Sequence, residues 1–274
     1  MGIDRSALMY KLAAVDLDDT LLGPDGTVSP RNAAAVRALS ASGVMVVLAS
    51  GRMHQDTAKY CPTLGLTGPV ISYNGAMVRS ADGSATYHHV PVLADLASQI
   101  VHWAQARGYS VNYYLDDTLY VRQRTPWTDL YTSRTGSVAH EVGDLTQFDG
   151  REPTKLIILE SPEETDRLLA EFRSRYASSL YITKTKPEYL EFMNRGVSKG
   201  KALEALSGRL GIPSAEMVSF GDSYNDVSML QYAGVGVAMG DGVEEARAAA
   251  DYVAPPCLED GFAAAVRHLF GLDV

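Results

Sequence analysis

The chain has 274 residues and a formal net charge of −9 at pH 7, an acidic balance that argues against a general nucleic-acid binder, which would show a basic patch. Its 46% hydrophobic and 21% charged residues are ordinary for a globular protein of one large or two smaller domains. We find no apolar run of membrane-spanning length and no secretory leader, so we expect a cytoplasmic protein that binds neither membranes nor nucleic acids.

Two smaller features bear on location. Cys61 and Cys257 lie far apart and in no metal-ligand spacing, so we expect reduced, packed thiols of an intracellular protein. Residues 1–6 match the short N-myristoylation pattern, which sequences often match by chance, and it does not by itself predict a lipid anchor.

The first quarter of the chain has the pattern of a parallel α/β unit. An apolar run over residues 10–16 predicts a buried strand, and Ser29 then caps a predicted helix over 30–41 that has proline at its first position. Two further strands are expected at residues 44–49 and 69–72, with a helix over 52–60 between them. Nearly continuous apolar strands that alternate with helices indicate a parallel sheet covered on both faces.

The middle of the chain predicts a different, α+β pattern of paired strands with two helices. The helices are expected over 92–107 and 162–177. The first hairpin turns at Asp116 and Asp117. The expected strands are 109–115, 118–123, 156–160, 180–185 and 189–193.

The α/β pattern returns at Ser198. Helices are expected at 198–210, 225–232, 243–250 and 260–270, and strands at 217–220, 235–239 and 252–254. The α/β unit is therefore split along the sequence by an insertion near 84–192.

Acidic residues follow the first predicted strand. Because side chains alternate along a strand, Asp16 and Asp18 are expected to point the same way, and two carboxylates that face one spot need a proton or a cation between them. Asp19 is explained more simply as a turn residue. In open α/β sheets, ligands bind beyond the carboxyl ends of the strands, which is where these acids lie.

A hydroxyl and a lysine mark two further positions. Ser50 and Gly51 follow the second strand at a helix start, where backbone N–H groups suit an anion. Lys199 lies in the first turn of a predicted helix, where a cation opposes the helix dipole unless an anion binds nearby. Taken alone, Ser50 is better explained as a plain helix cap. Lys199 taken alone is explained equally well as an exposed lysine.

A second acidic group follows the strand at 217–220. Asp222 suits a hard cation through its oxygens, and Asn225 offers amide donors to a phosphate. Asp226 enters the next helix, from which it could orient the others. Helix capping explains single members of these groups, but it does not explain why all four groups fall at strand ends of one sheet.

These residues resemble the motifs of the haloacid dehalogenase superfamily, most closely the Cof-type phosphatases of subfamily IIB. The resemblance covers nearly the whole chain, and its four principal motifs lie at residues 16–20, 50–52, 199–200 and 221–226. One departure is Pro255-Pro256-Cys257, where relatives often carry a polar segment with asparagine. We expect that difference to alter the rim of the site and not its chemistry.

The resemblance implies an α/β protein with a Rossmann-like parallel-sheet core at residues 1–83 and 193–274 and an inserted α+β cap domain at 84–192 that selects the substrate. It implies a Mg²⁺-dependent phosphatase that hydrolyses a small phosphorylated metabolite through an aspartyl-phosphate. A sugar phosphate is the first expectation, and nucleotides and pyridoxal phosphate stay open. A monomer is favoured, because a large cap can shield the site without a partner.

The resemblance also implies residue roles. Asp16 would attack phosphorus, and Asp18 would protonate the leaving oxygen and then take a proton from water. Mg²⁺ would be held by Asp16, the Asp18 carbonyl oxygen and Asp222, with Ser223 nearby. The phosphoryl group would contact Leu17, Ser50, Gly51, Lys199 and Asn225, with Asp226 supporting the site from behind.

Other functions remain open at this point. A phosphomutase needs the same acids, and the motifs do not separate it from a phosphatase. A phospho-aspartate receiver module also uses clustered acids and a lysine, but it is about half as long and lacks the insertion. A catalytically idle binding protein is disfavoured by the intact motifs.

Substrate recognition is expected in the insertion. Tyrosines stack on sugar or base faces, and arginines bind phosphates and carboxylates. Tyrosine is also simply a good strand residue. The candidates are Tyr109, Tyr113, Tyr114, Tyr120, Arg122, Arg124 and Tyr131.

Overall fold

The computed structural model describes residues 10–274, so the myristoylation-like residues 1–6 lie outside it. It divides into two compact units, one formed by residues 10–88 with 198–274 and the other by 89–197. The second unit thus begins at 89, not 84, and ends at 197, not 192. The reason is that strand β5 (Thr86–His89) extends the sheet of the first unit, and β11 (Tyr189–Asn194) runs to its end within the sheet of the second.

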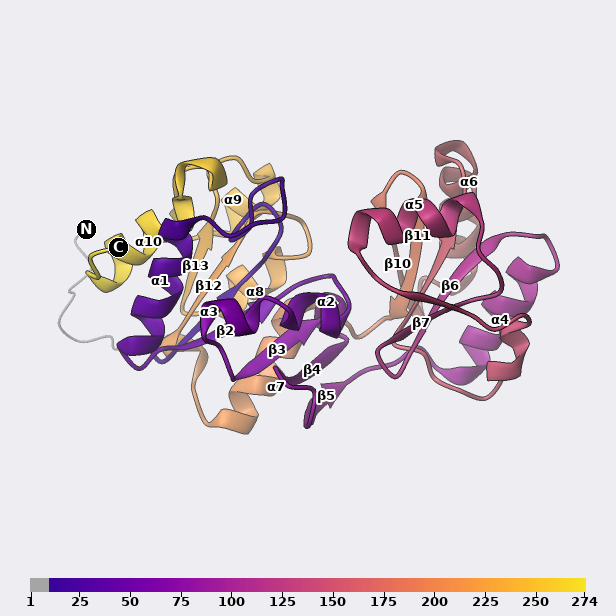
Figure 1. The fold of residues 1–274 in the computed structure, drawn as a ribbon, viewed down its shortest axis with the longest axis horizontal. Coiled ribbons are helices and arrows are strands. Elements are labelled where there is room, and N and C mark those ends of the chain that lie inside the picture. Colours follow the sequence, from indigo (N-terminus) through magenta and orange to yellow (C-terminus); the bar gives the residue numbers. More distant parts are fainter. Residues whose placement is uncertain (1–9) are drawn as a thin grey trace. The chain divides into compact units, whose positions relative to one another are not determined.

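The first unit is built on an eight-stranded sheet in the order β14-β13-β12-β1-β2-β3-β4-β5 (Figure 1). The first six strands in this order run parallel, and β4 pairs antiparallel with β3. Besides β5, its strands are β1 (Leu12–Val15), β2 (Met45–Ala49), β3 (Pro69–Ser72), β4 (Met77–Ser80), β12 (Met217–Gly221), β13 (Val235–Ala238) and β14 (Tyr252–Val253). The predicted α/β fold class with a parallel-strand core is confirmed.

Both faces of this sheet are covered by helices. All four residues of β1 are fully buried; Ala13 and Val15 join one hydrophobic core, and Leu12 and Ala14 join the other. The first core includes α1 (Pro30–Ala41) and α10 (Gly261–Phe270), and the second includes α7 (Lys199–Leu210) and α8 (Val227–Tyr232). This double burial explains why the strands read as continuous apolar runs.

The remaining helices of this unit are short. They are α2 (His54–Ala58), α3 (Cys61–Leu64), α9 (Glu244–Ala249) and the 3-10 turns η1 (Tyr73–Gly75), η3 (Ser214–Glu216) and η4 (Cys257–Glu259). The helix expected over 52–60 is thus confined to α2, and a separate turn, α3, follows it. Pro62 lies in the first turn of α3, where its missing N–H costs nothing, although it would break a longer helix.

Cys61 and Cys257 are both free and buried, as expected.

The second unit contains a six-stranded sheet in the order β10-β11-β9-β6-β7-β8. Besides β11, its strands are β6 (Ser110–Leu115), β7 (Thr118–Val121), β8 (Ala139–Glu141), β9 (Lys155–Leu159) and β10 (Leu180–Lys186). The helices α4 (Ala94–Gln105) and α6 (Pro162–Tyr176) contribute to one hydrophobic core with this sheet, together with the 3-10 turn η2 (Leu145–Phe148). The α+β character of this unit agrees with its pattern of paired strands.

Helix α5 (Pro126–Thr135) and strand β8 were not predicted. The apolar residues of α5 do not recur at helical spacing, so periodicity gives no signal. A local signal does exist: Thr125 caps the helix and Pro126 opens it, the same arrangement that marks α1 at Ser29. The helix packs through Tyr131, whose ring contacts those of Tyr114 and Tyr189.

Within residues 10–274, no helix combines the length and apolar character needed to cross a membrane.

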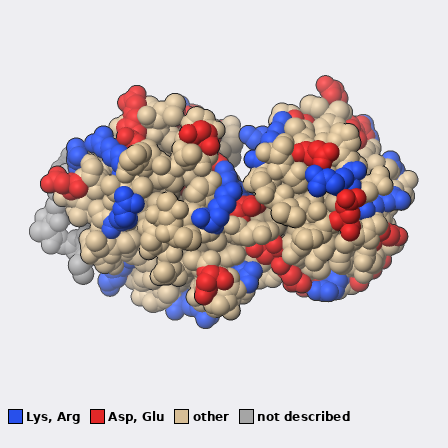
Figure 2. All heavy atoms as spheres, viewed as in Figure 1, with Lys and Arg blue, Asp and Glu red and all other residues tan. Residues whose placement is uncertain are grey.

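Basic and acidic side chains are interspersed over the face drawn in Figure 2.

Candidate active site

The candidate site lies at the carboxyl edge of the parallel sheet in the first unit. Strands β1 and β12 are neighbours, and the N–H of Asp16 bonds the carbonyl of Phe220 at 2.9 Å. On the other side of β1, the N–H of Ser50 bonds the carbonyl of Ile71 at 2.9 Å. The polar residues that follow β1, β2 and β12 therefore meet at one edge, where open α/β sheets bind their ligands.

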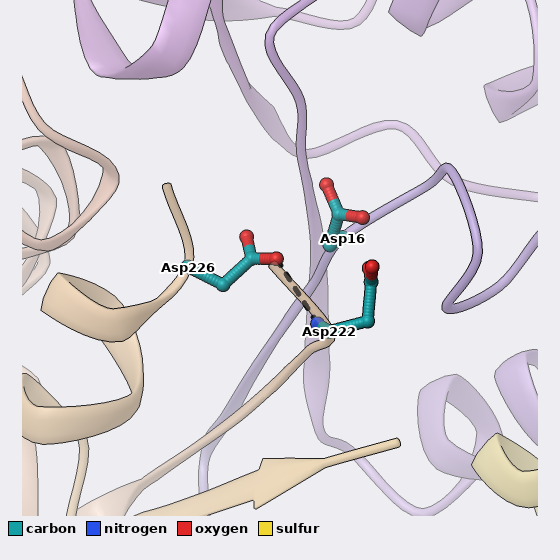
Figure 3. Close-up of side chains that lie close together, drawn as sticks. All are labelled: Asp16, Asp222 and Asp226. Carbon is teal, nitrogen blue, oxygen red and sulfur yellow. Dashed lines mark hydrogen bonds between the residues drawn. The ribbon is translucent and has the colours of Figure 1, made fainter. Parts of the chain in front are cut away.

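Three carboxylates lie together at this edge (Figure 3). One oxygen from each of Asp16, Asp222 and Asp226 lies within 4.8 Å of the others. Asp16 is 5% exposed and Asp226 is 0% exposed. Three carboxylates this close together, two of them buried, require cations or protons to be tolerated.

Asp226 is tied to the protein through both of its oxygens. Its Oδ2 accepts the backbone N–H groups of Asp222 and Ser223 at 3.0 Å each, the first of which is the dashed line in Figure 3. Its Oδ1 accepts a hydrogen bond from Lys199 Nζ at 2.6 Å. A Cβ on Gly221 would lie 2.5 Å from the Cβ of Asp226, so this packing requires glycine. Asp226 thus supports the β12–α8 loop from inside.

Lys199 supplies the positive charge of the cluster. Its side chain is fully buried, and Nζ donates to both Asp16 Oδ1 and Asp226 Oδ1. Ser198 caps α7 by accepting the N–H of Lys201 at 3.1 Å, which places Lys199 at the start of the helix. Burial alone would lower the pKa of Lys199, but Asp16 and Asp226 together hold that pKa above its usual range. The ammonium is therefore charged at neutral pH.

One lysine does not balance three carboxylates. Burial, and then the charge of Asp226, raises the pKa of Asp16 well above its ordinary value. The same two causes, in the same order, raise the pKa of Asp222 to about 7. The cluster thus has a deficit of positive charge.

The donor set fits a hard divalent cation. Asp16 and Asp222 each keep one carboxylate oxygen that accepts no hydrogen bond from a described residue, whereas Asp226 uses both of its oxygens within the protein. Carboxylate oxygens are the ligands that Mg²⁺ prefers. Asp16 and Asp222 are therefore the side chains that could hold such an ion.

Asp18 does not join this cluster. Its carboxylate contacts the guanidinium of Arg52, with Arg52 Nε 2.9 Å from Asp18 Oδ2, and the side chain is 52% exposed. Strand β1 ends at Val15, and Asp19 has a left-handed φ of 60°, so strand alternation does not extend to Asp18. The Asp18 carboxylate therefore does not share the close contact that the sequence suggested with Asp16; the carboxylates close to Asp16 are those of Asp222 and Asp226.

Three of the other predicted anion-binding residues, Ser50, Gly51 and Asn225, lie around the turn at Asn74. Asn225 Nδ2 donates to Asn74 Oδ1 at 2.9 Å, and the N–H of Asn74 bonds the carbonyl of Ser50 at 3.0 Å. A Cβ on Gly51 would lie 2.8 Å from Asn74 Oδ1. The buried Ser50 accepts the N–H of Arg52 at 3.2 Å, and the carbonyl of Leu17 accepts the N–H groups of the turn that follows it.

Sequence reasoning missed two of the residues that shape this site. Thr20 is fully buried, and its hydroxyl donates to Asp222 Oδ1 at 2.8 Å. Asn74 has a φ of 56°, a conformation that asparagine tolerates better than most residues. An Asn-Gly dipeptide such as the one at 74–75 is typical of a turn, but nothing local links it to Asn225, 151 residues away.

The substrate-recognition candidates of the second unit are divided between core and surface. Tyr113 belongs to the hydrophobic core, and Arg124 pairs with Asp129 at 2.6 Å. Tyr109 and Arg122 are among the residues that line a cavity of about 210 Å³. Of the candidates for substrate recognition, we therefore retain Tyr109 and Arg122, whose side chains line this cavity.

The split α/β unit and its buried lysine–carboxylate cluster are typical of a class of hydrolases in which a second domain is inserted into a parallel-sheet core. The family model described as haloacid dehalogenase-like hydrolase matches residues 13–266. The phosphatase YwpJ of Bacillus subtilis is 32% identical, over 94% of this chain and 99% of its own length. The 5-amino-6-(5-phospho-D-ribitylamino)uracil phosphatase YitU of the same organism is 28% identical, over 95% and 98%.

A solved structure of similar shape comes from Thermotoga maritima, with a TM-score of 0.89 and 28% identity over 97% of this chain and 98% of that one. The chain therefore belongs to the haloacid dehalogenase-like hydrolase family. These matches confirm the predicted family and its enzyme class, that of a phosphatase.

Proposed function

We propose that this protein is a Mg²⁺-dependent phosphatase that hydrolyses a small phosphorylated metabolite through an aspartyl-phosphate intermediate. The observation that carries the proposal is the position of Lys199 Nζ between Asp16 and Asp226, with Asp222 completing the acidic cluster. The buried Lys199 ammonium group can bind an anionic phosphoryl group. A metal ion that binds together with the substrate can balance the remaining charge of the carboxylates.

Asp16 is the proposed nucleophile. Its free carboxylate oxygen forms a bond to phosphorus as the bond from phosphorus to the leaving oxygen breaks, and Asp18 gives a proton to that oxygen. Asp18 then takes a proton from a water molecule, whose oxygen bonds phosphorus as the Asp16–phosphorus bond breaks. Inorganic phosphate leaves, and both carboxyl groups return to their starting states.

Asp16 and Asp222 would hold Mg²⁺, with the Asp18 carbonyl oxygen and Ser223 as further ligands. When bound, the ion would neutralise carboxylate and phosphoryl charge, a role that oxygen-rich sites support. Thr20 and Asp226 keep the Asp222 side chain and backbone in place for that purpose.

The phosphoryl oxygens would be bound by donors from three loops and one helix. Lys199 supplies a charge-assisted hydrogen bond, and Ser50 and Asn225 supply neutral ones. The backbone N–H groups of Leu17 and Gly51 complete the set. Electrostatic stabilisation by such fixed donors is the main source of rate in phosphoryl transfer.

We further propose that residues 89–197 form the substrate-selecting domain and that the substrate is a sugar phosphate or a related polyol phosphate. One relative carries a phosphorylated ribityl group in the name of its substrate. Tyr109 and Arg122 line open space in this domain and suit a polyhydroxylated or anionic group. A monomer is proposed, because one chain contains both the reactive cluster and this domain.

A panel assay tests the proposal. Phosphate release would be measured from sugar phosphates, nucleotides, pyridoxal phosphate and p-nitrophenyl phosphate, with Mg²⁺, with EDTA, and with the Asp16→Asn variant. We expect Mg²⁺-dependent release that is lost in Asp16→Asn. Isomerised sugar phosphate without release would identify a phosphomutase, and no product from any substrate would contradict the proposal.

A further inference from the structure

Arg52 holds Asp18 through a two-point contact. Arg52 Nε donates to Asp18 Oδ2 at 2.9 Å, and Nη2 donates to Asp18 Oδ1. The two residues lie 34 positions apart, on the loops that follow β2 and β1. The planar guanidinium matches the two oxygens of a carboxylate, so this geometry fixes the rotation of the Asp18 side chain as well as its distance.

Arg52 is itself held in place. Its Nη1 donates to the hydroxyl of Tyr60 at 3.2 Å, and that hydroxyl donates to the carbonyl of Gly26 at 3.1 Å. At the backbone, the N–H of Arg52 bonds Ser50 Oγ at 3.2 Å and its carbonyl accepts the N–H of Tyr73 at 2.8 Å. Both the side chain and the backbone of Arg52 are thus held in place. The backbone is held in part by Ser50, a predicted anion-binding residue.

Asp18 lacks any comparable support of its own. Its side chain is 52% exposed, whereas that of Arg52 is 25% exposed. Within the described part of the chain, Arg52 is the residue whose side chain hydrogen-bonds the Asp18 carboxylate. An exposed aspartate without this contact would sample several rotamers, and most of them would direct the carboxyl group away from a leaving oxygen.

We propose that Arg52 is a positioning residue for Asp18 and that Tyr60 fixes Arg52 in turn. This inference rests on the proposed function, in which Asp18 transfers the proton to the leaving group. The two-point contact with the guanidinium fixes the orientation of the Asp18 carboxyl group, which is the role that the proposal assigns to Arg52. In this scheme Arg52 does not touch the substrate and acts only through Asp18.

The nature of the leaving group provides a specific test. The p-nitrophenolate ion leaves readily without a proton, whereas the alkoxide of a sugar needs one. Loss of Asp18 positioning should therefore slow transfer from a sugar phosphate and leave p-nitrophenyl phosphate nearly unaffected. A variant that only disturbs the fold would slow both.

The experiment compares kcat/KM for p-nitrophenyl phosphate and for the best sugar phosphate of the panel, because kcat/KM reports the steps through transfer to Asp16. For Arg52→Ala we expect a loss of about ten- to a hundredfold with the sugar phosphate and less than about threefold with the aryl phosphate. Asp18→Asn should show the same selectivity to a greater degree. Tyr60→Phe keeps the ring and should show it to a smaller degree.

Arg52→Lys and Lys59→Gln serve as controls. Arg52→Lys keeps the charge without the two-point fork and should restore only part of the lost rate, which also covers the case in which Arg52→Ala does not fold. Lys59→Gln removes a neighbouring cation that contacts the Tyr60 ring, and it should not change the ratio of the two substrates.

Equal losses on both substrates, or no loss on either, would overturn the positioning role while leaving the phosphatase activity of the wild-type protein intact. Failure of the proposed function is a separate result, because the wild-type protein would then release no phosphate from either substrate.

Discussion

Lys199 Nζ lies 2.6 Å from Asp226 Oδ1, and both side chains are fully buried. The lysine comes from the first turn of α7, and the aspartate precedes α8. Their contact joins two helix starts that lie 27 residues apart, and Asp226 extends it to the backbone of Asp222. The pair therefore links the buried positive charge of Lys199 to the position of the β12–α8 loop, which carries the proposed metal ligand Asp222.

Replacing Lys199 with methionine should destabilise the protein strongly in the absence of metal. Removing one partner of a buried pair leaves its carboxylates uncompensated, at a cost of about 3–5 kcal/mol in the free energy of unfolding. Urea denaturation would measure this cost. Lys201→Met, which removes an exposed lysine from the same helix turn, is the control and should stay within about 0.5 kcal/mol of the wild type. Equal stability of the two variants would show that the buried pair is not a net contributor.

The stability of the metal-free protein should depend on pH through Asp222. The pKa of this group is raised from an ordinary value of 3.8 to about 7 in the folded protein, mainly by burial. Between these values the folded state binds a proton that the unfolded state has lost, so stability should fall as pH rises from about 4 to about 7. Thermal unfolding in EDTA at several pH values would measure the slope, and Asp222→Asn should reduce it.

Magnesium should stabilise the protein more strongly as the pH rises through the pKa of Asp222. The ion competes with the proton on Asp222, so the increase in melting temperature caused by Mg²⁺ should be larger at about pH 8 than at about pH 6. A pH-independent increase would show that the ion does not bind to this carboxylate.

Gly221→Ala should displace Asp226. The added Cβ would lie 2.5 Å from the Cβ of Asp226, and neither atom can move without its backbone. We expect a loss of about 1–3 kcal/mol in the free energy of unfolding together with weaker Mg²⁺ binding. Gly208→Ala is the matched control, because a Cβ at this position of α7 would meet nothing within 4 Å and should stabilise the helix slightly.

Thr20→Val should weaken metal binding without unfolding the protein. The substitution keeps the shape of the side chain but removes the hydroxyl that donates to Asp222 Oδ1. Loss of such supporting hydrogen bonds typically costs about 10- to 100-fold in metal affinity. Calorimetric titration with Mg²⁺ would show this, and Thr20→Ser should retain most of the affinity. Unchanged affinity in Thr20→Val would mean that Asp222 needs no support from this hydroxyl.

The layout of the α/β unit, and the edge of its sheet at which the candidate site residues lie, could be predicted from the amino-acid sequence alone. Apolar runs such as Leu12–Val15 specify doubly buried strands, and Ser29 and Ser198 mark helix starts through their own side chains. These signals are local, since burial period and capping depend on residues within one turn or strand. Because parallel strands end at one edge, the order of the strands along the chain is enough to group the polar residues that follow them.

Which side chains meet at that edge could not be predicted from the sequence and follows from the folded structure. It paired Asp18 with Arg52, set Asn74 against Asn225, and placed Asp222 beside Asp16. The alternation that would join Asp16 to Asp18 ends with the strand, at Val15. Contacts between loops far apart in sequence depend on how each loop turns, and residues such as Asp19 and Asn74, with left-handed backbones, turn in ways that strand and helix periodicity do not encode.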